Sequence, residues 1–555
     1  MKATPCPEPA FSDRVNRNEG SPWIRRLEWI VAITLSVVGL FLLFVRMANA
    51  GSLWRDEAES AQSALMPFGA MFRNFQVTSF PILFPLSVRA YMTFFGASDL
   101  SLRCFGLAVG IVLLGIALLP LRKLTSDFPL LLLAMIGLNA NFLVAGTSLR
   151  GYGLGSLLAV GALVAAIRFL GRPDFSGLAW LFLACLTSVQ CLFFNGPLAA
   201  AILTATMAVL LVRGNARSIW PLLGIAGACA LSCIPYLSRY LGGRRSTATP
   251  APVAPGAWDK IWENFQNAWG GLSPEVSWVW FGVISLLWIA AVWRLVTIWN
   301  KQLTPERELL LFGVTLITLS IVAYYAFFQV LPRQPGQRHF LALTCLVAAA
   351  ADVLWANLPR PYWLRLARIG VVLLAAIHLS FGIWPILVQA ESNAGSVAQI
   401  VEANADPADL VIINPWPYGI SFNWYYHGAA RWMTVPALAD HQVHRYDLML
   451  KKMESENPLQ DIKDEIVTTL KSGNRVWFIG ALPELPAPGE APLRLKPAPD
   501  PTFGWNGLVY RKAWSQEITG FLAQHTASIG DNLPIDQSIS GRENMILYVL
   551  QGWKD

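Results

Sequence analysis

Charged residues are scarce in this sequence. Asp, Glu, Lys and Arg make up only 14% of its 555 residues, whereas 54% are hydrophobic and 23 are Trp. Soluble globular proteins usually contain about 25% charged residues. The shortage excludes an ordinary soluble protein of this size, and the composition predicts a protein with many membrane-spanning segments.

Cysteine is also rare, and no Cys-x-x-Cys pair is present. Nearly all of the cysteines lie in apolar segments, which argues against a disulfide framework and against a zinc site built on such pairs. No basic stripe is interleaved with aromatic residues, so the net charge of +7 is not interpreted as affinity for nucleic acid. The seven cysteines are Cys6, Cys104, Cys185, Cys191, Cys229, Cys233 and Cys345.

The basic residues mark loops between apolar runs, as in membrane proteins that keep their positive loops inside. The predicted fold class is an α-helical polytopic membrane protein of about 11 transmembrane helices with a C-terminal extracytoplasmic α/β domain, in the inner (plasma) membrane. The N-terminus is expected in the cytoplasm, and the odd number of spans places the C-terminal domain in the periplasm or outside the cell. The expected spans lie near 27–45, 101–120, 128–145, 152–168, 178–195, 197–212, 218–238, 276–297, 309–331, 339–357 and 367–389, and 80–96 is expected to be a helix lying in the outer interface.

These runs divide the chain into three parts. We expect a cytoplasmic N-terminal segment at 1–26, a transmembrane domain at 27–389 and an outer α/β domain at 390–555. The last part is acidic, with about 13 Lys and Arg against 19 Asp and Glu. Its apolar stretches 410–413 and 475–479 predict buried strands, and the stretches near 395–404, 458–472 and 512–526 predict helices.

The first outer loop, 49–100, contains two adjacent acids, Asp56 and Glu57, after Trp54 and Arg55. A carboxylate at the outer membrane surface beside an aromatic and a cationic residue can act as a general base. The alternative is a helix start, in which Ser52 caps the helix and the acids favour its positive end. Both interpretations can hold together.

Two further outer segments carry cations. Arg150 and Tyr152 follow the third span, where they form either a phosphate-binding pair or an ordinary interfacial anchor. The turn before residue 340 contains Arg333, Arg338 and His339, and so many cations on the outer side favour an anionic ligand such as a lipid phosphate.

Two other patterns do not predict a ligand site. Gly151, Gly153 and Gly155 alternate but lack the GxGxxG spacing, so close helix packing explains them better than nucleotide binding. Asp440, His441 and His444 have metal-like spacing, yet they are interpreted as a solvated face of the C-terminal domain.

The combination of Leu-Trp-Arg-Asp-Glu-Ala after the first span with the later arginine motifs resembles the membrane-embedded C-type glycosyltransferases. The closer similarity is to family 39, the branch of protein O-mannosyltransferases and aminoarabinose transferases. Further matches are Leu102-Arg103, Leu149-Arg150-Gly151-Tyr152 and Gln337-Arg338-His339-Phe340. Ser79-Phe80-Pro81 stands where many relatives have His-Pro-Pro, and Arg338-His339 stands where they have Arg-Tyr.

This resemblance implies a transferase that moves a sugar from a polyprenyl-phosphate donor to an acceptor hydroxyl on a lipid, glycan or protein. Asp56 would be the base, and Glu57 would orient or support it. Arg150, Arg333 and Arg338 would bind the lipid phosphate, with Arg55, Tyr152 and His339 beside them. No organic cofactor is implied and no metal ligands are assigned, while a divalent metal stays open.

Two other classes of function compete with this one. Many spans with charged helix ends also suit a secondary transporter or a flippase, although such proteins tend to show repeated halves and ionisable groups near the middle of the membrane. A non-catalytic component of envelope polysaccharide assembly would need Asp56 only for capping. Sugar transfer that survives Asp56→Asn would contradict the catalytic proposal, and a deletion strain without a change in its envelope glycans would favour the transporter.

Overall fold

The structure is a computed structural model that describes residues 22–73, 80–236, 257–271, 273–330, 335–480, 493–530 and 538–555. Within them, nine helices are long and apolar enough to cross a membrane, which confirms a multi-pass helical protein. They are α2 (Pro22–Asn49), α6 (Asp99–Ile116) with its continuation to Thr125, α9 (Gly151–Gly171), α11 (Gly196–Val212), α12 (Ile219–Ser232), α16 (Pro274–Ile298), α17 (Pro305–Val330), α18 (Leu341–Asn357) and α19 (Tyr362–Leu387).

Two of the predicted spans take another form. The 178–195 run is the shorter helix α10 (Phe175–Cys191). The 128–145 run is broken into α8 (Leu130–Gly137) and the π-helix η3 (Phe142–Gly146). At the break, the Asn139 side chain accepts a hydrogen bond from the Asn141 N–H (2.9 Å) and donates one to the Ala268 carbonyl (2.9 Å). These bonds satisfy backbone polar groups that an interrupted helix leaves without hydrogen-bond partners inside a membrane protein.

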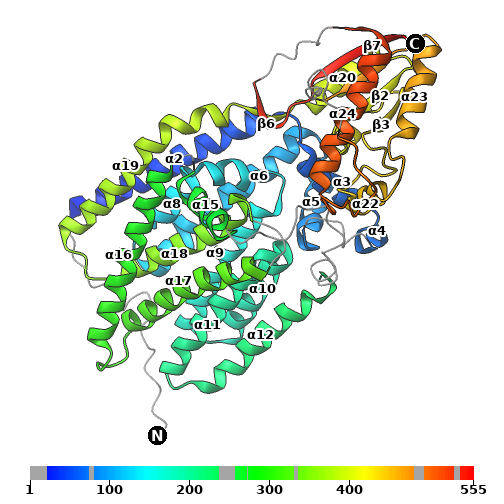
Figure 1. Ribbon diagram of the computed structural model, residues 1–555. Coiled ribbons are helices and arrows are strands. Elements are labelled where there is room, and N and C mark those ends of the chain that lie inside the picture. Colours follow the sequence, from blue (N-terminus) through cyan, green and yellow to red (C-terminus); the bar gives the residue numbers. More distant parts are fainter. Residues whose placement is uncertain are drawn as a thin grey trace.

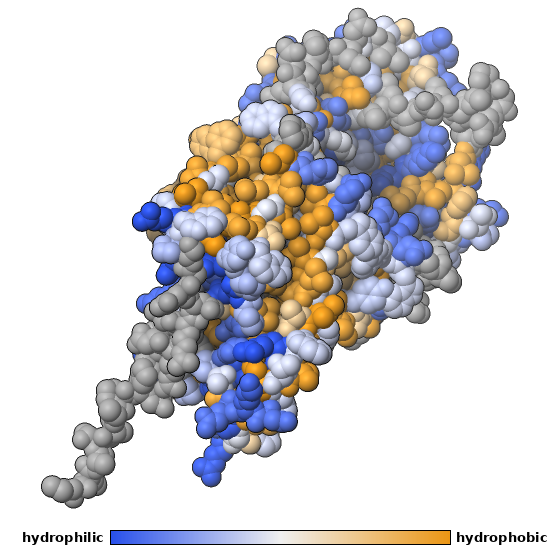
Figure 2. All heavy atoms as spheres, turned by 90° about the vertical axis from the view of Figure 1, so that its left-hand side faces the viewer, coloured by the Kyte–Doolittle hydropathy of each residue, from blue (hydrophilic) through white to orange (hydrophobic). Residues whose placement is uncertain are grey.

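Helix α18 forms the centre of the bundle, because every residue from Leu341 to Ala356 is buried. A helix that is apolar all round belongs in the interior. The outer surface of the bundle is apolar as well. Figure 2 shows an orange band over the middle of the bundle with blue surface at its ends. Exposed side chains such as Phe41 and Trp293 contribute to this lipid-type surface.

Ion pairs join the helices at the end of the bundle where α2 begins. Each pair links segments that are distant in sequence, and most of the partners are buried. The pairs are Glu28 with Arg365, Asp127 with Arg360, and Glu308 with Arg213. They connect α2 to the start of α19, the segment before α8 to the segment before α19, and the end of α11 to the start of α17.

The described part of the predicted first outer loop lies at the opposite end of the bundle. It forms the helices α3 (Arg55–Leu65), α4 (Phe68–Arg73) and α5 (Leu83–Phe95), and α5 packs against both α3 and α10. The helix expected at 80–96 is therefore present. In Figure 1 these blue helices lie between the bundle and the C-terminal region.

The C-terminal region contains a five-stranded sheet in the order β3-β2-β4-β7-β5. Strand β2 is parallel to β3 and β4, whereas β7 is antiparallel to β4 and β5. The predicted strands and helices are present, and β1 and β6 form a second small sheet. The elements are β1 (Ala390–Ser392), α20 (Ala394–Asn404), β2 (Leu410–Ile413), α21 (Tyr418–Tyr425), β3 (Arg431–Thr434), α22 (Tyr446–Met453), α23 (Gln460–Lys471), β4 (Val476–Ile479), α24 (Gly507–His525), β5 (Thr526–Ile529), β6 (Ile539–Glu543) and β7 (Leu547–Trp553).

This C-terminal region packs directly on the first outer loop. Helix α21 contacts α3, and the Tyr425 hydroxyl accepts a hydrogen bond from the Leu53 N–H (2.6 Å) and donates one to Asp99 (2.8 Å). The Gln62 side chain donates to the Ile420 carbonyl (3.0 Å). Helix α3 is thus enclosed between the bundle and the C-terminal region.

Candidate active site

Helix α3 carries three buried carboxylates. Asp56, Glu57 and Glu59 are 8%, 0% and 1% exposed. Residues three apart lie on one face of a helix, so Asp56 and Glu59 share a face, while Glu57 points to another side. Buried carboxylates need cationic or hydrogen-bonding partners, and the carboxylates on the two faces have different partners.

Three cationic or polar-aromatic side chains surround the Asp56 carboxylate. Its Oδ2 lies 3.7 Å from Arg150 Nη2 and 3.6 Å from Arg338 Nη2, and its Oδ1 lies 3.6 Å from His444 Nε2. These partners come from the turn before α9, the turn before α18 and the C-terminal region. Tertiary folding thus gathers four distant sequence segments at one carboxylate.

The surroundings of Asp56 keep it ionised. Burial is the largest influence and raises its pKa, but Arg150, His444, Arg338 and Arg55 together lower it further than burial raises it. The net result is a pKa below the ordinary value for an Asp side chain. At neutral pH, Asp56 therefore carries the negative charge that a base requires.

Arg150 is anchored on α3. Its Nη1 donates to the Asp56 carbonyl (2.5 Å) and pairs with Glu59 Oε2 (3.1 Å), and its guanidinium lies 4.5 Å from the centre of the Phe80 ring. A small cavity beside this arginine is lined by Glu59, Phe80 and Ser63 among others. Arg150 is only 6% exposed, so these contacts with α3 and Phe80 enclose most of its side chain.

Arg338 is the most accessible cation of the cluster. Its side chain is 36% exposed, and its guanidinium lies 5.8 Å from the ring centres of both Trp54 and Tyr152. Its contact with Asp56 is an ion pair at 3.6 Å. An incoming anion can therefore approach Arg338 from the open side while Asp56 stays behind it.

Tyr152 and His339 form the aromatic side of the cluster. The Tyr152 hydroxyl lies 3.5 Å from His339 Nε2, and the rings of Phe80 and Phe194 pack edge-on against Tyr152 and His339 respectively. The His339 Nδ1 accepts a hydrogen bond from the Gly336 N–H (2.8 Å). The Nδ1 also lies 3.1 Å from the Gly336 carbonyl, so the backbone of Gly336 holds the ring with its Nε2 facing Tyr152.

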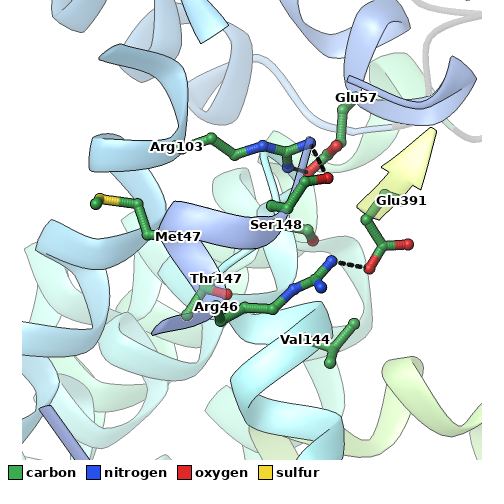
Figure 3. A pocket seen from close by; sticks show the side chains of 9 residues that line it. Arg46, Met47, Glu57, Arg103, Val144, Thr147, Ser148 and Glu391 are labelled. Carbon is green, nitrogen blue, oxygen red and sulfur yellow. Dashed lines mark hydrogen bonds and ion pairs between the residues drawn. The ribbon is translucent and has the colours of Figure 1, made fainter. Parts of the chain in front are cut away.

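Glu57 lies in a separate ion-pair cluster. Its Oε1 accepts hydrogen bonds from Arg103 Nη1 (2.5 Å) and from the Leu149 N–H (2.9 Å). Figure 3 shows Glu57 with Arg103, and Arg46 with Glu391, around a cavity with room for little more than a water molecule. Because Leu149 precedes Arg150, Glu57 fixes the turn that carries this arginine rather than facing Asp56's cations.

Arg55 faces the C-terminal region. Its backbone N–H donates to Glu543 Oε2 (2.5 Å), and its guanidinium donates to the Arg542 carbonyl (3.0 Å) and lies over Trp54 and Tyr418. The N-cap position of α3 is Trp54, whose side chain makes no cap. The predicted Ser52 cap is wrong, because the Ser52 hydroxyl instead accepts a hydrogen bond from the Gly395 N–H (3.1 Å).

Comparison with solved structures yields a distant likeness of fold. No protein-family model matches the sequence, and the search of curated proteins finds no match. The fold is similar to the crystal structure of ArnT from Cupriavidus metallidurans bound to undecaprenyl phosphate. The TM-score is 0.49 and the identity 12%, over 81% of this chain and 92% of that one. A likeness of this size does not transfer a function, so the proposal below rests on the geometry around Asp56.

Among the predicted site residues, Asp56, Arg150, Tyr152, Arg338 and His339 come together in space. Arg333 lies outside the described residues. In the part of the chain that the structure describes, no group of three or more His, Cys, Asp or Glu side chains is arranged to hold a metal ion.

Two members of the cluster were not predicted from sequence. Glu59 could have been found, because it follows Asp56 by three residues and so shares its helix face. His444 could not, and its interpretation as part of a solvated face is wrong, since it is 7% exposed and faces Asp56 and Glu59. Its burial depends on the C-terminal region packing on α3, which no local pattern encodes.

Proposed function

We propose that this protein is a membrane glycosyltransferase that moves a sugar from a polyprenyl-phosphate donor to an acceptor hydroxyl. We further propose that it belongs with the C-type enzymes of family 39 and acts on the outer face of the inner membrane. The observation that carries the proposal is the ionised, buried Asp56 carboxylate within 3.7 Å of both Arg150 and Arg338. The cluster combines a base with binding groups for a phosphate at one end of the helical bundle.

In the proposed reaction, the acceptor hydroxyl oxygen attacks the anomeric carbon of the sugar. The bond from that carbon to the phosphate oxygen breaks, and Asp56 takes the hydroxyl proton. Direct displacement inverts the anomeric centre and passes through an oxocarbenium-like state. The leaving group is the polyprenyl phosphate, which is already a good anion, so arginines that stabilise its growing charge suffice.

The same arginines link donor binding to the strength of the base. In the free protein they lower the pKa of Asp56, and burial works against them. A donor phosphate at Arg338 would neutralise part of this positive field. Asp56 would then become a stronger base when the donor is in place.

Glu57 and Arg55 have supporting roles in this proposal. Glu57 fixes the turn before Arg150, and Arg55 ties the start of α3 to the C-terminal region. Tyr152 and His339 line the donor side next to Arg338. The acceptor is a hydroxyl group of a lipid, a glycan or a protein.

The placement of charge favours this enzyme over a transporter. Among the described residues, the ion pairs of the transmembrane domain lie at the helix ends, as with Glu28 and Arg365 at one end and Asp56 and Arg338 at the other. Transport pathways place ionisable groups near the middle of the membrane.

Replacement of Asp56 tests the proposal. Asp56→Asn keeps the shape of the side chain and removes the base, so sugar transfer should fall by at least about 100-fold. The assay uses purified protein in lipid nanodiscs, polyprenyl-phosphate donors with a labelled sugar, and an envelope extract that supplies acceptors. Asp461→Asn is the matched control, because Asp461 forms a surface pair with Lys452.

Transfer that survives Asp56→Asn would overturn the role of Asp56. A wild-type protein that moves labelled donor across vesicles without forming a glycoside would instead favour a flippase.

A further inference from the structure

We infer that His444, from the C-terminal region, is a positioning residue that holds Asp56 in place for reaction. This inference rests on the proposed function. Its second anchor is Glu59, so that one imidazole bridges two carboxylates of α3. The C-terminal region would then be part of the catalytic centre rather than a separate appendage.

The ring of His444 faces one carboxylate with each nitrogen. Its Nε2 lies 3.6 Å from Asp56 Oδ1, and its Nδ1 lies 3.3 Å from Glu59 Oε2. The His444 backbone N–H also points to Glu59 Oε1 at 3.5 Å. The histidine therefore spans the helix face that Asp56 and Glu59 share.

The charges around Asp56 divide between its two oxygens. Oδ2 faces Arg150 and Arg338, whereas Oδ1 faces His444. When a donor phosphate draws Arg338 towards itself, the attraction between Arg338 and Oδ2 becomes weaker. The contact at Oδ1 does not depend on the phosphate, so it keeps the carboxylate aimed while the donor is bound.

Aromatic packing fixes the imidazole. Tyr446 stacks on it with a centre-to-centre distance of 5.7 Å, and Trp416 packs edge-on at 6.0 Å. The adjacent Arg445 pairs with Asp440 and Asp447, which pins the loop that carries the histidine. A ring so restrained can transmit its position to Asp56, and a misplacement of about 1 Å in a reacting group can cost about 100-fold in rate.

Two substitutions separate the two contacts of the ring. In Gln the amide nitrogen reaches the position of Nε2, which faces Asp56, whereas in Asn it reaches the position of Nδ1, which faces Glu59. His444→Gln should therefore keep kcat within about 10-fold of the wild type, and His444→Asn should lose about 100-fold. The KM for the donor should stay within about twofold in both, because neither change touches Arg150 or Arg338.

His441 provides the matched control. It lies in the same loop, packs against Trp432 with the two ring centres 4.5 Å apart and the rings tilted, and forms no ion pair with α3 among the described residues. His441→Gln and His441→Asn should leave transfer unchanged. Equal losses of kcat in His444→Gln and His444→Asn, or losses that follow their unfolding temperatures, would overturn the inference.

A measurement without turnover distinguishes failure of this inference from failure of the proposed function. The unfolding temperatures of Glu59→Gln, His444→Gln and the double variant should be non-additive by about 2 °C if the pair is formed, because Gln leaves the position of Nδ1 facing Glu59 empty. If the two substitutions are coupled but the wild-type protein transfers no sugar, the proposed function is refuted and the contact between His444 and Glu59 stands. Additive temperatures would refute the contact whatever the activity.

Discussion

Asp56 illustrates how a few charges set the chemistry of one residue. Its folded-state pKa is lowered, so its ionised form contributes stability above the ordinary value near 3.8 and loses it as pH falls through the lower folded value. The same shift keeps the proposed base active under acidic conditions. Each neighbouring cation should therefore move the acid limb of the reaction.

Removing Arg338 should raise the pKa of Asp56. In Arg338→Gln, the acid limb of kcat/KM for sugar transfer should move to higher pH by roughly one unit, because a nearby opposite charge shifts a carboxyl by about 1–3 units. A pH–rate profile of the free enzyme measures this shift. Arg431→Gln removes an exposed arginine of the C-terminal region that pairs with Glu465, and its profile should coincide with that of the wild type. An unshifted limb in Arg338→Gln would contradict the electrostatic assignment.

At the scale of elements, the start of α3 is capped from the other end of the chain. Glu543, at the end of β6, is fully buried and accepts hydrogen bonds from the Arg55 N–H and the Ser421 hydroxyl. An acid at a helix start is favoured by the backbone dipole. Burial nevertheless raises the pKa of Glu543 to about 7, against the lowering effect of Arg55.

This raised pKa predicts a pH-dependent stability. The protonated carboxyl contributes stability that is complete below its ordinary value of 4.5 and is lost as pH rises to about 7, by up to about 3 kcal/mol. In Glu543→Gln the side chain cannot ionise, so the fall in unfolding temperature between pH 5 and 7 should be reduced. Calorimetry of the two proteins in one detergent gives the comparison. Parallel curves would show that another group titrates.

Small residues also set the distance between elements. A Cβ at Gly153 of α9 would lie 1.8 Å from the Gly146 carbonyl of η3, whereas a Cβ at Gly161 of the same helix would meet nothing within 4 Å. The close packing predicted for the glycines after Arg150 is thus confirmed. The contact holds the turn that carries Arg150 against the bundle.

Alanine should be costly at Gly153 and tolerated at Gly161. Gly153→Ala should destabilise the protein by about 1–3 kcal/mol, because backbone atoms must move, and it should lower sugar transfer by displacing Arg150. Gly161→Ala should be neutral or stabilise the helix by up to about 1 kcal/mol. Thermal unfolding and transfer rates test both changes. Equal behaviour of the two variants would show that the turn tolerates the displacement.

At the scale of the whole molecule, the proposed orientation places α3 and the C-terminal region outside. The loop between α9 and α10 then lies in the cytoplasm. Arg172 in that loop and Glu456 in the C-terminal region are both exposed. They provide two positions at which the two sides of the membrane can be compared.

A membrane-impermeant maleimide should distinguish the two sides. Glu456→Cys should react in intact cells, whereas Arg172→Cys should react only after lysis, because the reagent does not cross the membrane. Labelling is compared with the parent protein, whose natural cysteines give the background. The reverse pattern would contradict the proposed orientation.

Much of the molecule follows from the sequence alone. Apolar runs long enough to cross a bilayer identified the helical domain, and the alternation of charge between them predicts that the basic loops share one side of the membrane. The strand 410–413 was predicted at its observed bounds, because a short apolar run between polar segments is typical of a buried strand. Asp56, Arg150 and Arg338 were recognised because cations and acids at an outer membrane surface are costly without a partner.

Other features were decided only by the tertiary structure. The break at Asn139 depends on carbonyls of a distant segment. The different roles of Asp56 and Glu57 depend on which arginine contacts each face of α3. The burial of His444 and the cap from Glu543 arise when the C-terminal region packs on α3. Local periodicity reports which face of a helix is buried, but the partner of each charge is set by long-range packing. The sequence by itself therefore determined the membrane domain and the acidic motif, and the fold determined which charges surround Asp56.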